Sequence, residues 1–152
     1  MRRFAPNRAQ AMTQICSWAS DCGMSGPRGG VIRSYRDLLV WQRAMDLVVS
    51  SYRLAKNLPK EELYGLTSQI RRAATSVPAN IAEGQGRRST GQFLQFLGIA
   101  NGSLLELETH FLAAEKLGLL KSADLEATFR LTGEVGRMLA GLMRRLRERQ
   151  IS

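Results

Sequence analysis

The chain has few of the side chains that metal sites and disulfide frameworks use. It holds two cysteines, Cys16 and Cys22, and one histidine, His110. Structural zinc takes four cysteine or histidine ligands, so two thiols without a neighbouring histidine exclude a zinc site. They imply no disulfide framework either, and we expect a reducing, cytoplasmic location. No run approaches the ~18 apolar residues that span a membrane.

The single histidine also argues against catalysis. A ferritin-like di-iron site needs a Glu-x-x-His pair on two helices, but Leu107 lies three residues before His110 and no second histidine exists. Glu106 lies four residues before His110, which predicts a surface pair on a helix instead. A Ser-His-Asp triad would have to use the same histidine, and no nucleophile elbow accompanies it. We therefore expect no enzyme activity, no metal and no cofactor.

What the chain does have is positive charge. Its 152 residues suit a single domain, and 44% hydrophobic with 23% charged residues is a globular composition. The formal net charge is +9 and the pI is about 10.5. Such a charge indicates an anionic partner, either nucleic acid or an acidic surface, or else only a solvated surface.

Residues 1–33 differ in composition from the rest. They are rich in Arg, Gly, Ser and Pro and show no helical period, so we interpret them as a flexible tail. An organellar transit peptide is one alternative. Another is a mis-called start, with Met24 or Val31 as the true beginning.

Helix boundaries are marked by capping residues. Ser34, with Asp37 in the first turn, opens the first helix. Pro59 lies near the start of the second helix, and Gly118 ends the third. The remaining signals are a Ser89–Gln92 capping box that opens the third helix, and Ser122 followed by Asp124 at the start of the fourth.

Between these boundaries apolar residues recur every three or four positions, which predicts amphipathic helices. No run reads as a strand. The short connections favour an all-α fold, an antiparallel up-down four-helix bundle over residues 34–150. The predicted stripes are Leu38, Trp41, Met45, Val48, Tyr52 and Ala55; Leu63, Leu66, Ile70, Ala73, Ala74, Val77 and Ile81; Phe93, Leu97, Ala100, Leu104, Leu107, Phe111 and Ala114; and Leu125, Phe129, Thr132, Val135, Leu139, Leu142 and Leu146.

Two helices carry apolar residues beyond one stripe. A second seam predicts contact with another copy of the chain, and the alternative is a wide core face. The second seams are Val40, Leu47 and Leu54 in the first helix, and Leu94, Leu105 and Leu112 in the third.

Three stretches are distinctive: "YRDLLVWQRAMDLV", "LPKEELYGLTSQIRRAATSVPANIAEGQGRRS" and "FLGIANGSLLELETHFLAAEKLGLL". Over residues 35–120 they resemble the four-helix-bundle family of 23S rRNA intervening-sequence proteins, and "YGLTSQIRRAATSVPANIAEG" is close to its signature. The resemblance implies a bundle that assembles as a homopentamer. The chain is also similar to the accessory variability protein of diversity-generating retroelements, a basic pentamer associated with nucleic acid and a reverse transcriptase. No catalytic activity is established for the family.

Arginines form the candidate nucleic-acid site. Arginine favours bidentate phosphate contact, and few exposed aromatics accompany these residues, so we predict recognition of the RNA or DNA backbone or shape. Arg87 and Arg88 precede a helix N-terminus, whose dipole favours a phosphate, although they could also be solvated beside a capped turn. The other candidates are Arg71 and Arg72 on the second helix and Arg137, Arg144, Arg145, Arg147 and Arg149 on the fourth.

The stretch "GQGRRSTG" looks like a phosphate loop, but it lacks both a preceding strand and the Gly-Lys-Ser/Thr of a P-loop. We interpret it as a corner between helices. Pro78 bends the second helix, while Asn80 and Glu83 satisfy backbone groups there. Glu83 could equally pair with Arg71, Arg72 or Arg87. Gly84 and Gly86 release the chain, and Ser89 starts the next helix.

These observations favour a non-enzymatic, self-associating protein that binds RNA or DNA through repeated arginine patches. The alternative is an interaction scaffold whose basic face docks an acidic protein such as a reverse transcriptase.

Overall fold

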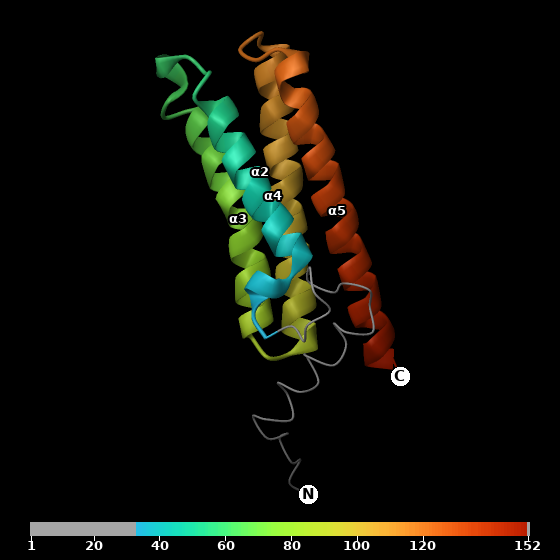
Figure 1. Ribbon diagram of the computed structural model, residues 1–152. Coiled ribbons are helices and arrows are strands. Elements are labelled where there is room, and N and C mark those ends of the chain that lie inside the picture. The colour runs from blue at the N-terminus through green and yellow to red at the C-terminus, as the bar shows by residue number, and fades with distance from the viewer. Residues whose placement is uncertain (1–32, 152) are drawn as a thin grey trace, which may run out of the picture.

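The computed structural model describes residues 33–151, apart from the side chains at positions 149 and 151. The predictions for residues 1–32, including both cysteines, lie outside this range. Within it the protein is all-α, as predicted, with four long helices and no strand (Figure 1). The elements are η1 (Tyr35–Asp37), α2 (Leu39–Ala55), η2 (Lys60–Glu62), α3 (Leu66–Gly86), α4 (Thr90–Lys116) and α5 (Ser122–Ile151), where η marks a short 3-10 helix.

Each long helix packs against two others. α2 contacts α3 and α5, and α4 also contacts α3 and α5, so α2 and α4 lie diagonally across the fold. Figure 1 shows the α2–α3 and α4–α5 connections at one end of the molecule. The α3–α4 connection lies at the opposite end, together with the start of α2 and the end of α5. The two ends therefore present different parts of the sequence.

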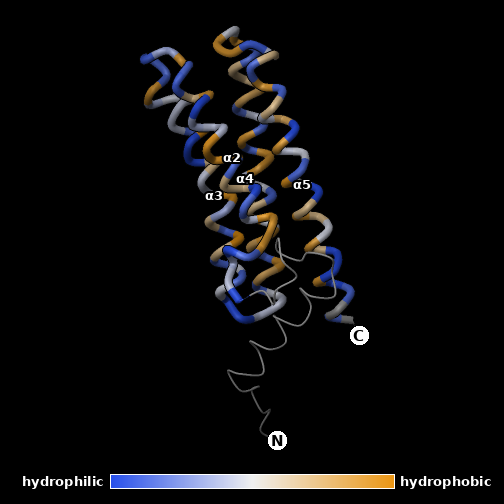
Figure 2. Tube along the Cα trace, in the orientation of Figure 1, coloured by the Kyte–Doolittle hydropathy of each residue, from blue (hydrophilic) through white to orange (hydrophobic). Residues whose placement is uncertain are grey.

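The core runs between the four helices, and hydrophobic positions recur along each of them (Figure 2). All seven residues of the stripe predicted for residues 93–114 are buried in α4. Six of the seven residues predicted for the last helix are buried as well, the exception being the half-buried Phe129. Burial of each large side chain contributes about 1.5–3 kcal/mol, so these stripes account for much of the stability. The largest fully buried residues include Phe111, Ile70, Ile81, Leu97, Leu107, Leu125, Leu139 and Leu142.

The stripe predicted for the first helix is wrong in part, because Leu38 and Ala55 are buried as predicted but the middle of the buried face consists of other residues. Val40 and Leu47, assigned to a second seam, are fully buried, and Leu54 is 8% exposed. Met45 and Tyr52, assigned to the core, are 38% and 37% exposed. The small residues Ala44 and Ser51 share the buried face of α2, so this face carries less hydrophobic side-chain volume than the outer one. Periodicity alone therefore favoured the wrong face.

The second seam predicted for α4 is largely exposed, whereas the one predicted for α2 is buried. Leu105 is 54% exposed and Leu112 is 46% exposed, while Leu94 is half-buried and packs against the core. An unpartnered apolar strip thus runs along the outer face of α4. Ile99 is also 45% exposed, but it lies six residues before Leu105 and therefore about a third of a turn away around the helix.

Several helix boundaries differ from the predicted ones. Ser34 is a capping residue as expected, and it forms a capping box with Asp37, but the helix that it caps is η1, and α2 begins only at Leu39. Pro59 precedes η2, and α3 begins seven residues later at Leu66. Leu63, predicted to lie in the core, therefore falls in the connection and is 46% exposed.

Candidate nucleic-acid interface

The corner between α3 and α4 turns at arginine and not at glycine. Gly84 and Gly86 lie in the last turn of α3 and do not release the chain, which corrects the prediction. The break comes at Arg88, whose φ of 56° lies in the left-handed region that side chains disfavour. Ser89 precedes α4, but its side chain makes no capping bond, so the predicted capping box with Gln92 does not form.

Gly84 has a packing role instead. A Cβ atom added there would lie 2.6 Å from Cβ of Phe96 and 2.9 Å from Cδ2 of Phe93. Both phenylalanines belong to α4, so the missing side chain is what lets α3 and α4 approach each other at this end.

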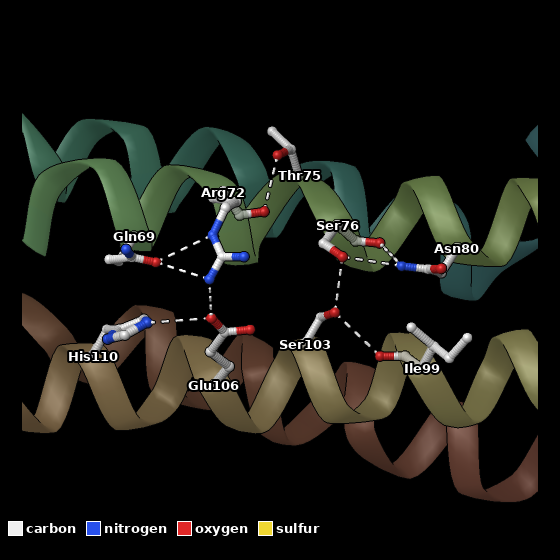
Figure 3. A network of polar contacts seen from close by, with 9 residues as sticks. All are labelled: Gln69, Arg72, Thr75, Ser76, Asn80, Ile99, Ser103, Glu106 and His110. Atoms are coloured by element: carbon white, nitrogen blue, oxygen red, sulfur yellow. Dashed lines mark hydrogen bonds and ion pairs between the residues drawn. The ribbon is translucent and has the colours of Figure 1, made fainter. Parts of the chain in front are cut away.

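Pro78 lies inside α3, which continues without a break to Gly86. Asn80 Nδ2 donates to the carbonyl oxygen of Ser76 at 2.8 Å and lies 3.0 Å from its hydroxyl. That hydroxyl is 2.8 Å from the Ser103 hydroxyl of α4, which in turn donates to the Ile99 carbonyl at 3.1 Å (Figure 3). Asn80 therefore belongs to a polar network that joins the two helices.

Arg71 and Arg72 are adjacent in sequence but do not form a joint patch. The Arg71 guanidinium lies over the Tyr52 ring at 5.4 Å, and its buried Nε has no hydrogen-bond partner among the described residues. Arg72 bonds Oε1 of Glu106 on α4 at 2.6 Å (Figure 3). The same Glu106 oxygen is 3.6 Å from His110 Nε2, so the predicted Glu106–His110 pair is present. Both arginines hold helices together.

Arg87 and Arg88 differ in their surroundings. Arg87, one of the three partners predicted for Glu83, forms an ion pair with that residue. Its guanidinium lies 5.2 Å from the centre of the Phe96 ring. Arg88 is exposed and has no ion pair among the described residues. Of the two, Arg88 presents the less compensated charge.

The fold brings this corner against the end of α5. Leu146 lines a small depression together with Arg88 and Ser89. A Cβ atom on Gly91 would lie 3.8 Å from Nε2 of Gln150. We call the surface around this contact the arginine end, which Figure 1 shows opposite the α2–α3 connection. Its arginines come from the start of the described chain, the α3–α4 connection and the last turns of α5, and they are Arg33, Arg36, Arg87, Arg88, Arg144, Arg145 and Arg147. The candidate Arg137 lies near the middle of α5 instead.

The arginines of α5 are only partly compensated. Arg144 lies 4.0 Å from Glu148, a separation that gives a weak surface pair. Arg137 and Arg147 are exposed and have no ion pair with any described carboxylate. Arg145 is half-buried. The side chain of Arg149, the fifth candidate on this helix, lies outside the described residues.

Sequence reasoning did not single out Arg36. It is exposed and lies over the Tyr35 ring at 5.5 Å, at the start of the described chain. The short helix η1 that holds it packs against α2 and α3, so Arg36 belongs to the same end of the molecule as the start of α2 and the α3–α4 connection (Figure 1). No local signal marked it as part of the site.

The opposite end carries lysine. All four lysines of the chain lie in or next to the α2–α3 and α4–α5 connections, which we call the lysine end. Acidic residues accompany them there, including Glu61, Glu62, Glu115 and Asp124. The lysines are thus confined to one end of the described structure, where Arg53 in the last turn of α2 accompanies them.

Residues 33–151 contain neither a candidate metal site nor a candidate membrane-spanning helix. No cluster of three or more histidine, cysteine or acidic side chains could hold a metal ion there. None of the helices combines the length and the apolar character needed to cross a membrane.

Comparison with known proteins identifies relatives of this arrangement. The pattern of the 23S rRNA-intervening sequence protein family matches residues 36–141. A crystal structure of a protein with unknown function from the S23 ribosomal protein family of Bacteroides thetaiotaomicron VPI-5482 is similar in fold, with a TM-score of 0.65 at 23% identity. The similarity covers 69% of this chain and 98% of that one. No curated protein matches the sequence.

Proposed function

Because the chain belongs to the 23S rRNA-intervening sequence protein family, we propose that it is a non-enzymatic, oligomeric protein of the cytoplasm that binds RNA or DNA. The contact is with the nucleic-acid backbone and is made by the arginine end. The observation that carries this proposal is that Arg88 lines the same depression as Leu146 of α5, although more than fifty residues separate the two. Leu146 lies in sequence among Arg144, Arg145 and Arg147.

Two physical properties of the arginine end support backbone binding. Guanidinium groups bind phosphate oxygens in a bidentate geometry that lysine cannot match. Glu83 forms an ion pair with Arg87, and Glu148 lies near Arg144. Arg88 and Arg147 form no ion pair with a described carboxylate. Their charge is therefore available to an external anion, and release of counterions from a phosphate backbone would drive binding.

We further propose that the helices form an antiparallel up-down bundle that assembles into a homopentamer. Apolar strips on the outer faces of α2 and α4 support self-association: Met45 and Tyr52 on one, Leu105 and Leu112 on the other. Since α2 and α4 are diagonal, these strips point in different directions. Two different patches on one chain suit a head-to-tail interface, which generates closed rings. A ring would repeat the arginine end and raise its avidity.

The nucleic-acid proposal is tested by salt dependence together with charge reversal. Arg144, Arg145 and Arg147 are changed to Glu, and binding of a labelled duplex RNA is measured by fluorescence anisotropy across a salt series. We expect the affinity of the unmodified protein to fall steeply with salt. The variant should lose affinity and about 0.9 in the log–log slope for each phosphate contact removed.

The lysine end supplies a matched control. Changing Lys56, Lys60 and Lys116 to Glu alters the net charge by the same amount at the opposite end, and should leave the slope close to that of the unmodified protein. An equal loss in both variants would mean that only overall charge matters. Tight binding that neither salt nor the arginine variant weakens would contradict the proposal.

The oligomer is tested separately by native mass spectrometry. Leu105→Glu combined with Leu112→Glu places two charges in the α4 strip and should release monomers. Leu117→Glu is the control, because Leu117 is more exposed, at 68%, but lies at the lysine end outside the strip. A monomeric unmodified protein would exclude the ring.

A further inference from the structure

An open groove of about 340 Å³ lies beside the start of α2, along α5. Its apolar surface comes from Leu39 of α2 and from Met138 and Leu142 of α5. Gly141 lies among them, and a Cβ atom added there would meet nothing within 4 Å. The groove therefore has an apolar floor with open space above one turn of α5.

The charges around this groove are biased to one sign. Arg137 and Arg145 line it, eight residues apart on α5, which corresponds to about 12 Å along the helix axis. Glu134 also lines it, but Arg43 of α2 holds its carboxylate at 3.0 Å. The acidic charge is thus compensated from within the protein, and Arg137, which forms no ion pair with a described carboxylate, biases the groove toward an anionic occupant.

We propose that the groove docks an acidic amphipathic helix of a partner protein. A groove beside a helix, with apolar residues on its floor, is the usual receptor for the apolar face of such a helix. Two carboxylates placed about two turns apart on the ligand would face Arg137 and Arg145, while leucine-like side chains between them cover Met138 and Gly141. Met138 is flexible enough to adjust to the shape of its ligand.

A bare nucleic-acid backbone suits this groove less well. Phosphates gain nothing from an apolar floor, and the floor here contains no exposed aromatic ring on which a base could stack. The inference goes beyond the proposed function, because it assigns a protein ligand to a groove that shares Arg145 with the surface proposed to bind nucleic acid. The two ligands would therefore compete for Arg145.

The test uses a fluorescent synthetic amphipathic helix with two glutamates at the spacing of Arg137 and Arg145 and leucines between them. The matched control peptide has lysine in place of both glutamates. Anisotropy should show saturable binding of the acidic peptide, with a Kd below about 1 mM, and no saturation by the lysine peptide. Absence of saturation by the acidic peptide, or equal binding of the two peptides, overturns the proposal.

Variants of the protein locate the binding. Gly141→Leu fills the groove and should weaken peptide binding by about tenfold or more, whereas Gly141→Ala should keep most of it. Arg137→Glu should produce a similar loss and shift the preference toward the lysine peptide. Ala127→Leu introduces the same side chain at an exposed position of α5 outside the groove, and this variant should bind as the unmodified protein does. Thermal melts establish that each variant is folded.

Two other results would assign the groove to a different ligand. If Gly141→Leu weakens duplex RNA binding and leaves the peptide unaffected, the groove belongs to the nucleic-acid interface. If the same variant changes the oligomer mass in native mass spectrometry, the occupant is a second copy of the chain. Either result overturns the proposal. Neither depends on the arginine-to-glutamate variant that tests nucleic-acid binding.

Discussion

At both the arginine end and the lysine end the chain leaves a long helix through a residue with positive φ, but the residue differs between the two ends. At the lysine end the chain leaves α4 through Gly118, with a φ of 72°. At the arginine end it leaves α3 through Arg88, with a φ of 56°. Glycine adopts this conformation without steric cost, but arginine does not. The difference shows that the lysine end follows backbone preference, while the arginine end keeps a charged side chain at an unfavourable backbone position.

The hydrogen bonds of the two corners reinforce this contrast. After α4, the amide of Leu119 donates to the Ala114 carbonyl at 2.9 Å, and the amide of Gly118 donates to the Glu115 carbonyl at 2.9 Å. These bonds close the helix in the manner of a Schellman motif. After α3 the amide of Arg87 donates to Gly84 at 3.2 Å, and the Ser89 side chain makes no capping bond to α4. The lysine end is the better satisfied corner.

The largest effect is expected at the arginine end, from packing. Gly84→Ala forces a methyl group against Phe93 and Phe96 and should lower the free energy of unfolding by about 1–3 kcal/mol. The control is Gly86→Ala in the same helix turn, where a Cβ meets nothing within 4 Å, and it should be neutral or slightly stabilising. Urea denaturation measures both. Equal stability of the two variants would show that α3 and α4 do not depend on close approach here.

The next effect is at the lysine end. Gly118→Ala places a side chain in the left-handed region and should cost roughly 1–2 kcal/mol of unfolding free energy. Nothing lies within 4 Å of a Cβ at this position, so the cost would come from the backbone alone. Urea denaturation again provides the measurement, and an unchanged midpoint would remove the contrast between the two corners.

The reciprocal change at the arginine end should have the opposite sign. Arg88→Gly relieves the same backbone strain, and Arg88 has no ion pair among the described residues to lose. We expect unfolding free energy to rise by up to about 1 kcal/mol, partly offset by the greater freedom of glycine in the unfolded chain. If Arg88 contacts phosphate, anisotropy will show weaker RNA binding in the same variant. A more stable protein with unchanged affinity would exclude Arg88 from the interface.

The two variants with the smallest expected effects on stability should differ from each other in nucleic-acid binding. Glu83→Gln and Glu126→Gln each remove one exposed i,i+4 ion pair, with Arg87 and Arg130 respectively, and each should change stability by about 0.5 kcal/mol or less. At the arginine end, loss of the Glu83 charge should tighten nucleic-acid binding. Glu126 is remote from that end and should have little influence on it. Tighter binding in both variants would indicate a long-range charge effect.

The sequence predicted α4 well because bulky residues occupy its buried positions at regular spacing, from Phe93 to Ala114. It failed for part of α2 for a physical reason. The buried face of α2 holds the small residues Ala44 and Ser51, whereas the larger Met45 and Tyr52 are exposed. Hydropathy describes how unfavourable it is to expose a side chain to water. It does not distinguish a helix face that packs on the core from one that is available to another chain.

The candidate site was predictable in its parts but not in its assembly. Clusters such as Arg87 with Arg88 are visible in the sequence, and so is the basic end of α5. Their proximity is not visible, because it follows from packing of α5 beside the α3–α4 corner. Gly84 shows the same limit. A glycine at this position predicted a chain break, but the role of Gly84 is set by the phenylalanines of a neighbouring helix.

The pattern of helix contacts also orders the folding of the chain. Among the described long helices, every contact except that between α2 and α5 joins neighbours along the chain. Local contacts form fastest, so we expect the α3–α4 hairpin to nucleate folding and the meeting of α2 with α5 to complete it. The groove beside Leu39 would then be assembled last and lost first on unfolding. A ligand that occupies it would slow unfolding by keeping the first and last helices together.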